Sequence, residues 1–268
     1  MRVIYLKLIN IFIMHPINKI LSYSGWQLYR SRRQSNFPKG FRAKYRGDFA
    51  SLKNNPPAGF DIASEVLYES GDHPDNYIDY ECAFAARHLG RISPQNILDI
   101  GSYRHFILGL LANYKVTTVD VRDRKPISNN ETIVTCDAKK LALPDAFFDT
   151  IVSLCSLEHF GLGRYGDEID FGADIKALKE MVRVLKPGGH LIFTTEMARA
   201  PRPIIVFNTH RIYTHDLISK MCGDLGLIME EERFFSRIYN RQCELDEVLI
   251  DPIKKKTQDV YLGCWKKV

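Results

Sequence analysis

The sequence predicts an α/β fold: a mostly parallel sheet with an antiparallel C-terminal edge, preceded by a basic appendage. Three observations lead to this prediction. From residue 96 onward, short apolar or β-branched runs alternate with helical stretches, which is typical of a parallel sheet with helices on both faces. Two further strand-like runs close the chain and are expected to form the antiparallel edge. The net positive charge is concentrated before residue 55.

The expected strands are short and consist mainly of apolar and β-branched residues. The clearest helix covers residues 173–185 and comes just before the fifth strand. Between them, Pro187 and Gly188 have the order that suits a type II turn. The strands are expected at residues 96–100, 116–121, 132–136, 150–154, 190–195, 227–232 and 260–265.

The charge of the chain is unevenly distributed. Its 268 residues, 45% of them apolar, are enough for one large globular domain with an appendage. Residues 1–54 hold eleven basic side chains and one acidic one, a balance of +10, whereas residues 55–268 hold 26 basic and 31 acidic ones, a balance of −5. Such an asymmetry indicates an anionic partner for the basic arm.

The N-terminal arm starts with apolar residues but is not expected to cross a membrane. Its apolar stretch is interrupted by Lys7 and stops at Pro16, short of the ~20 residues that a span requires, and no signal-peptide cleavage site is clear. Residues 17–30 suggest a short amphipathic basic helix, which either lies on anionic lipid or packs on the main body. If lipid is the partner, we therefore expect residues 1–33 to bind an anionic membrane surface. Nucleic acid is not expected, because no recognition motif accompanies the basic residues.

The composition divides the chain into three parts. Residues 34–60 are rich in Pro, Gly, Asn and Lys and are expected to form an irregular linker. A helix is expected over residues 76–90, with Gly90 as its C-terminal stop. The predicted parts are an arm with its linker, a helical lead-in and a ligand-binding domain, at residues 1–54, 55–95 and 96–268.

The six cysteines predict neither a disulfide framework nor a zinc site. No two of them form a C-x-x-C pair, and none has finger-like spacing to histidines. A reducing compartment is the simplest account of this usage. No metal is expected, because the acidic residues at positions 167–174 suit a solvated face better than a ligand set.

Three acidic residues lie at the ends of predicted strands. In an open α/β sheet, ligands bind at the carboxyl ends of the strands. Asp99 is followed closely by Gly101, which allows the backbone to approach a ligand. Asp120 either accepts two hydrogen bonds from ribose hydroxyls or is an exposed aspartate in a turn. Asp137 can accept a hydrogen bond from an exocyclic amine such as that of adenine.

The residues after Gly101 argue against a nicotinamide dehydrogenase. A dinucleotide-binding loop needs the pattern G-x-G-x-x-G, whereas Ser102, Tyr103, Arg104 and His105 follow here. Two of the three glycines of the fingerprint are therefore missing.

Taken in their order along the chain, these motifs resemble those of the class I S-adenosylmethionine-dependent methyltransferases. The resemblance covers about residues 76–268 and includes the L-P-x-x-x-F-D entry to the fourth strand and the L-K-P-G-G turn. It implies a Rossmann-like, doubly wound sheet of seven strands and S-adenosyl-L-methionine as the cofactor. The stretches SLEHFGLGRYGD and FNTHRIYT resemble a small bacterial branch of this superfamily.

The resemblance also assigns roles to individual residues. Asp99, Gly101 and Ser102 would lie at the methionine and ribose part of the cofactor, and Asp120 would bind the ribose hydroxyls. The remaining contacts are implied for the adenine (Asp137, Ala138) and for the methionyl end (Cys155, Ser156, Glu158).

Methyl transfer needs little covalent help, because alignment of the acceptor with an activated methyl supplies much of the rate. A hydroxyl acceptor also needs a base, usually a histidine or a carboxylate. His159 and Glu158 follow the fourth strand, where His159 is either this base or a loop histidine. His210 follows the fifth strand and is either catalytic or part of the lead-in to a helix capped by Thr214.

Two features are candidates for binding the acceptor. Arg211 could pair with an acidic group of the substrate. The loop at residues 161–167 holds three glycines and is either a lid that carries Tyr165 over the ligand or a flexible connector.

The sequence thus predicts O-methylation of a small molecule or a glycan. The glycan, and with it polysaccharide biosynthesis, follows only from the resemblance of the I-N-K-I-L arm to enzymes of cell-surface polysaccharide assembly. The alternative is a non-catalytic scaffold of the same fold that docks to a membrane-associated assembly. We expect a cytoplasmic protein, peripheral to the inner face of the membrane if the arm binds lipid.

Overall fold

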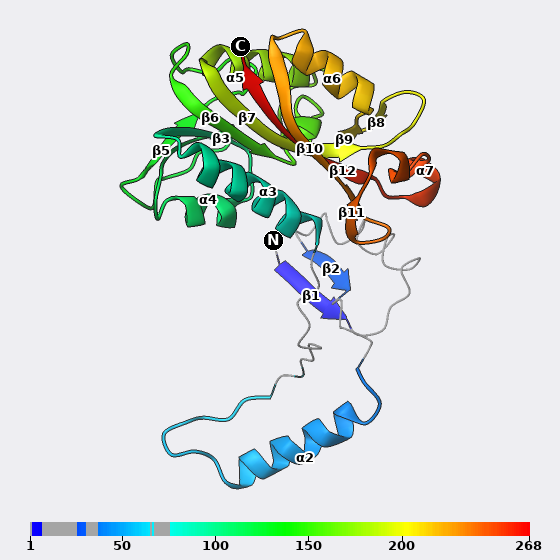
Figure 1. Cartoon of the computed structure of the whole chain (residues 1–268). Coiled ribbons are helices and arrows are strands. Elements are labelled where there is room, and N and C mark those ends of the chain that lie inside the picture. Colours follow the sequence, from blue (N-terminus) through cyan, green and yellow to red (C-terminus); the bar gives the residue numbers. More distant parts are fainter. Residues whose placement is uncertain (1, 7–25, 31–36, 65, 67–75) are drawn as a thin grey trace. The chain divides into compact units, whose positions relative to one another are not determined.

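The computed structural model describes residues 2–6, 26–30, 37–64, 66 and 76–268. The chain forms two compact units, residues 1–73 and residues 74–268 (Figure 1). In the part of the chain described, no helix is long and apolar enough to cross a membrane.

The smaller unit differs from the sequence prediction. Strand β1 (Arg2–Leu6) pairs in parallel with β2 (Trp26–Arg30), so the C-terminal part of the expected amphipathic helix is a strand. The rest of that prediction, at residues 17–25, lies outside the described residues. Gly25 separates the two parts, and the aromatic residues of Trp26–Arg30 favour an extended backbone.

The expected linker over residues 34–60 is also wrong in part, because it contains helix α2 (Phe41–Asn54). Aromatic residues four positions apart share one face of this helix, and the rings of Tyr45 and Phe49 stack with centroids 6.1 Å apart. Lys44 forms an ion pair with Asp48 one turn later, at 2.8 Å. These local pairs stabilise a helix in a segment whose Pro and Gly content indicated a loop.

The larger unit contains an eight-stranded sheet in the order β11-β10-β12-β7-β6-β3-β4-β5. The last five strands of this order are parallel, whereas β12 runs antiparallel to both β7 and β10. The predicted fold class is confirmed, with the three-residue β11 added at the edge. The strands are β3 (Asn96–Ile100), β4 (Lys115–Asp120), β5 (Glu131–Thr135), β6 (Phe148–Leu154), β7 (Leu185–Met197), β10 (Leu227–Ser236), β11 (Arg241–Cys243) and β12 (Asp259–Lys267).

Helices cover both faces of the sheet (Figure 1). Alternate residues of β3 point to opposite faces: Leu98 packs with α5 (Ala173–Val184) and α6 (His215–Gly223), and Ile97 packs with α3 (Tyr77–Ile92) and α4 (Arg104–Leu110). The sheet is therefore buried on both sides, which explains its nearly continuous apolar strands.

The expected helices are present, with shifted ends. Helix α3 starts at an Asn76 capping box and runs through Gly90 to Ile92. Helix α6 begins after Thr214, whose hydroxyl accepts a hydrogen bond from the Leu217 amide at 3.4 Å, as predicted. Three short elements were not predicted, namely α7 (Pro252–Lys255) and the hairpin of β8 (Ile204–Val206) and β9 (His210–Ile212).

Candidate active site

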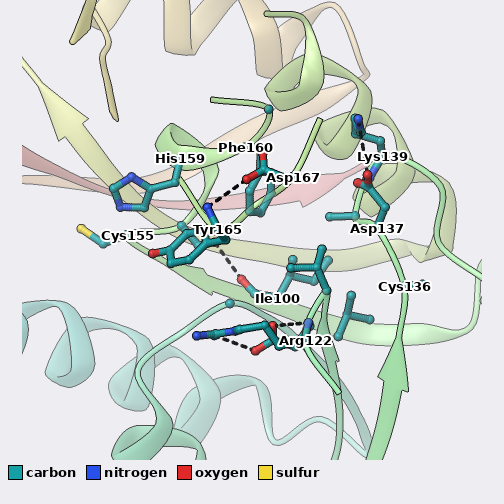
Figure 2. A pocket seen from close by; sticks show the side chains of 17 residues that line it. Ile100, Arg122, Cys136, Asp137, Lys139, Cys155, His159, Phe160, Tyr165 and Asp167 are labelled. Carbon is teal, nitrogen blue, oxygen red and sulfur yellow. Dashed lines mark hydrogen bonds and ion pairs between the residues drawn. The ribbon is translucent and has the colours of Figure 1, made fainter. Parts of the chain in front are cut away.

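A pocket with a cavity volume of about 110 Å³ lies at the carboxyl ends of β3, β4, β5 and β6 (Figure 2). This is the topological switch point of the sheet, where the strand order reverses: from β3 the chain continues to β4 and β5 on one side and to β6 and β7 on the other. The predicted residues that line the pocket are Gly101, Asp120, Asp137, Ala138, Cys155, Ser156, His159 and Tyr165.

The turn after β3 is held by residues beneath the pocket. Gly101 has φ +71°, and a Cβ there would lie 2.9 Å from the Cβ of Ser156, so both the backbone conformation and the space require glycine. Asp99 is buried and accepts a hydrogen bond from the Ser102 amide at 3.1 Å. Burial raises the pKa of Asp99 to about 6. Asp99 and Ser102 therefore shape the turn without lining the pocket.

Asp120 ends β4 and is surrounded by arginine donors. Its Oδ1 accepts from the backbone N–H and the Nε–H of Arg122 at 3.0 and 2.9 Å, and its Oδ2 accepts from Arg122 Nη2 at 2.8 Å. Arg124 Nε lies 2.7 Å from the same Oδ2. Burial acts to raise the pKa of Asp120, but the hydrogen bonds from Arg122 and the charges of both arginines outweigh it and hold the pKa below its ordinary value.

The far end of the pocket combines a carboxylate with apolar walls. Asp137 is half exposed, and its Oδ1 accepts from the Lys139 amide at 2.9 Å. Val121, Cys136 and Phe160 line the same space. A planar ring with a hydrogen-bond donor at its edge fits this combination.

Cys155 lies where β6 opens into the pocket. Its φ is +45°, and its Sγ–H donates to Oε1 of the buried Glu81 at 2.8 Å. Burial raises the pKa of Cys155 well above its ordinary value, so the group remains a thiol. The next residue, Ser156, donates from Oγ to the Ile100 carbonyl at 2.8 Å and ties the β6 loop to the end of β3.

Glu158 is completely buried and does not line the pocket. Its Oε2 accepts from the Thr195 hydroxyl at 3.0 Å, whereas its Oε1 has no hydrogen-bond partner within the described structure. Burial, assisted by the negative charge of Glu196, raises the pKa of Glu158 to about 8. The side chain is therefore mostly a neutral acid at pH 7.

His159 lines the pocket and is held in one tautomer. Its Nδ1 lies 2.7 Å from the Thr209 carbonyl, so Nδ1 carries the proton and Nε2 carries the lone pair. Burial lowers the pKa of His159 to about 4, and the Arg164 charge acts in the same direction. Its Nε2 lies 3.8 Å from Glu158 Oε1. The imidazole is thus neutral at pH 7, and its Nε2 lone pair lies 3.4 Å from Nη1 of Arg164.

His210 and Arg211 lie beside the pocket and not in its lining. The His210 ring is 6.4 Å from that of His159, and its Nε2 lies 3.1 Å from Glu196 Oε2. Arg211 is almost fully buried, donates to the Phe160 carbonyl at 2.7 Å and pairs with Asp174 at 3.3 Å. The partners of its guanidinium are therefore groups of the protein itself, and not the acidic substrate group that we expected.

The glycine-containing loop contributes Gly161, Tyr165 and Asp167 to the lining of the pocket. The Tyr165 ring is near two guanidinium groups, those of Arg122 and Arg164, each 5.4 Å from the ring centroid. Figure 2 shows the ring close to both Arg122 and His159. Asp167 holds the loop by accepting from the Tyr165 amide at 3.1 Å.

The neighbouring acidic residues have partners of their own. Asp170 pairs with Lys176 at 2.7 Å and with Lys139 at 3.6 Å. Among the described residues, no three His, Cys, Asp or Glu side chains are arranged to hold a metal ion.

Three contributors to the site were missed by sequence reasoning. Glu81 comes from α3, 74 positions before Cys155, and Glu196 lies inside the apolar β7, so neither carried a recognisable pattern. Arg122 is only two positions after Asp120, but nothing in the sequence indicated that the two side chains pair.

The larger unit has the fold of the class I S-adenosylmethionine-dependent methyltransferases. The chain is similar to the 1,6-didemethyltoxoflavin-N1-methyltransferase of Burkholderia thailandensis, with TM-score 0.53 and 16% identity over 88% of this chain and 92% of that one. It is also similar to the [4+2]-cyclase SpnF, with TM-score 0.55 and 17% identity over 86% of this chain and 96% of the cyclase. At these identities the likeness establishes the fold alone.

Residues 111–245, half of the chain, match the family described as Caenorhabditis protein of unknown function, DUF268, and the chain belongs to this family. Two curated relatives are ubiquinone/menaquinone biosynthesis C-methyltransferases named UbiE. That of Ectopseudomonas mendocina is 33% identical over 37% of this chain, and that of Nitrosospira multiformis is 30% identical over 44%. The matched regions span 36% and 43% of those relatives.

Proposed function

We propose that the protein is an S-adenosylmethionine-dependent methyltransferase that modifies a hydroxyl group of a small-molecule or glycan acceptor. The observation that carries the proposal is the convergence of Asp120, Asp137 and the Cys155–His159 loop on one pocket at the switch point of the sheet. The glycan, with a place in polysaccharide assembly, is supported only by the resemblance of the N-terminal arm.

The chemistry of the pocket fits the cofactor. Asp120 is an ionised acceptor suited to ribose hydroxyls, and Asp137 is an acceptor at the edge of an apolar slot suited to adenine. Gly101 and Ser156 bring two loops into contact, which leaves the backbone of the first loop close to the pocket. The formed pocket favours an enzyme over the non-catalytic scaffold.

The bound cofactor would supply a methyl group on a sulfonium that is already activated for transfer. The contribution of this chain is to place the acceptor and take up its proton. His159 would accept the proton of the acceptor hydroxyl at Nε2 while the methyl group passes from the sulfonium sulfur to the acceptor oxygen, leaving a neutral thioether; the Thr209 carbonyl keeps Nε2 unprotonated beforehand. Tyr165 and its loop line the pocket and can cover the bound acceptor.

Calorimetric titration of the full chain with S-adenosylhomocysteine tests this proposal. We expect binding in the micromolar range, about −8 kcal/mol, and no comparable binding of NAD. Circular dichroism establishes that the titrated protein is folded. The absence of binding at millimolar ligand to a folded protein would falsify the proposed function.

We further propose that the basic arm binds an anionic membrane surface, which would make the protein peripheral to the inner face of the membrane. The support is the balance of +10 over residues 1–54. The full chain should co-sediment with vesicles containing phosphatidylserine at low salt. Changing Arg30, Arg32 and Arg33 to glutamine should weaken vesicle binding by about 3 kcal/mol, on the order of 100-fold in the partition coefficient, at about 1 kcal/mol per basic residue. Equal sedimentation of the two proteins would contradict the proposal.

A further inference from the structure

The carboxylate that is expected to bind ribose is already saturated with hydrogen-bond donors. An ionised carboxylate offers about four lone-pair positions, two on each oxygen. In Asp120, the backbone N–H and Nε of Arg122 lie against Oδ1, and Nη2 of Arg122 and Nε of Arg124 lie against Oδ2. A ribose therefore finds no vacant position on Asp120 in this arrangement.

If the Arg122 side chain alone left Asp120, two lone-pair positions would become vacant, which is the number that a ribose diol needs. The Arg122 backbone N–H stays on Oδ1 and Arg124 stays on Oδ2, so one position becomes vacant on each oxygen. The vicinal diol of a ribose carries two hydroxyl donors. The bidentate guanidinium and the diol are thus alternative occupants of the same two positions.

We propose that Arg122 is a latch on the ribose site: its side chain competes with the cofactor diol for Asp120 and must leave before the cofactor binds. This inference rests on the proposed function, because it concerns the same pocket. The latch selects for ligands with two adjacent hydroxyls, since a single hydroxyl replaces only one of the two hydrogen bonds that the guanidinium loses.

Arg122, and not Arg124, has the freedom to act in this way. The Arg122 side chain is 56% exposed and lines the pocket, whereas that of Arg124 is 29% exposed and does not line it. The Arg122 guanidinium also lies 5.4 Å from the centroid of the Tyr165 ring, so an aromatic partner is adjacent when the side chain leaves Asp120. A cation over an aromatic face is stabilised there, so the displaced group keeps a partner.

The test compares S-adenosylhomocysteine binding by calorimetry in the wild type, R122M and R124M. We expect R122M to bind about tenfold more tightly, since the ligand no longer displaces two charge-assisted hydrogen bonds. R124M is the matched control, because it vacates a position on only one oxygen and leaves Arg122 in place; its affinity should not rise. R122K should lie between wild type and R122M, because an ammonium cannot hold both oxygens in the planar fork of a guanidinium.

Salt provides a second readout. The Arg122–Asp120 pair is partly exposed, so raising NaCl weakens it. Wild-type affinity should therefore rise with salt relative to that of R122M. Equal or weaker binding by folded R122M, while the wild type binds, would overturn the latch and leave the proposed function standing. Failure of both proteins to bind would overturn the proposed function and the latch with it.

Discussion

The D120N variant is expected to bind S-adenosylhomocysteine about 100-fold more weakly than the wild type. Asparagine keeps the shape of the side chain, but it loses the charge and replaces one acceptor oxygen by an NH₂ donor that faces the ribose hydroxyls. Hydrogen bonds to a charged group contribute about 1.5–3 kcal/mol, and a 100-fold loss corresponds to about 2.7 kcal/mol. D120N also weakens the competing contact with Arg122, which favours ligand binding and offsets part of the lost affinity.

Calorimetry measures this change, and D123N is the matched control. Asp123 is exposed in the same loop and does not line the pocket, so its amide variant should bind like the wild type. The R122M substitution should no longer tighten binding when D120N is present, because the two side chains act through one contact. A D120N affinity within threefold of the wild type would show that the ribose is held elsewhere.

The second large effect concerns stability and pH. Burial raises the pKa of Glu158 to about 8 from an ordinary value of 4.5. Between these pH values, the folded protein keeps a proton that the unfolded chain has lost, so the free energy of unfolding falls as pH rises. The favourable contribution of the neutral acid is fully present below about pH 4.5 and is lost as the pH rises through about 8.

The E158Q variant cannot ionise and should escape this loss. Its free energy of unfolding should be close to that of the wild type at pH 5 and should exceed it at pH 8, by a difference on the order of 2–4 kcal/mol. Urea unfolding at pH 5, 6.5 and 8 measures the difference. E168Q serves as the control, because Glu168 is exposed and its replacement should leave the pH dependence unchanged. Parallel pH curves for wild type and E158Q would contradict the prediction.

The sheet was predictable because each of its strands can be recognised from its own residues. Residues such as Leu98 and Ile151 are buried between two helical layers, so the strands appear in the sequence as short, nearly continuous apolar runs. Helix α2 was not predictable in this way. Its aromatic pairs stabilise it one turn at a time, while Gly47 and the surrounding prolines give the segment the composition of a loop.

The same distinction applies within the pocket. Asp120 and Asp137 could be predicted to lie at one pocket because a strand-end position is a local property, and parallel strands bring their carboxyl ends to one edge. The sequence did not predict the protonation state of the acidic residues, nor which hydrogen-bond donors contact them. Glu158 looked like a candidate base in the loop, but complete burial makes it a neutral acid at pH 7.

The sequence by itself determined the order of the elements, the parallel sheet and the edge at which the pocket lies, because these follow from hydrophobic periodicity and from residues next to each strand. Only the tertiary structure decided how each polar group is used. It brought Glu81 from α3 against Cys155, buried Arg211 against carbonyl groups, and placed Arg122 on Asp120 and under Tyr165. Burial and competition for hydrogen bonds arise from segments distant in the chain, and they set which side chains are charged and which positions are available to a ligand.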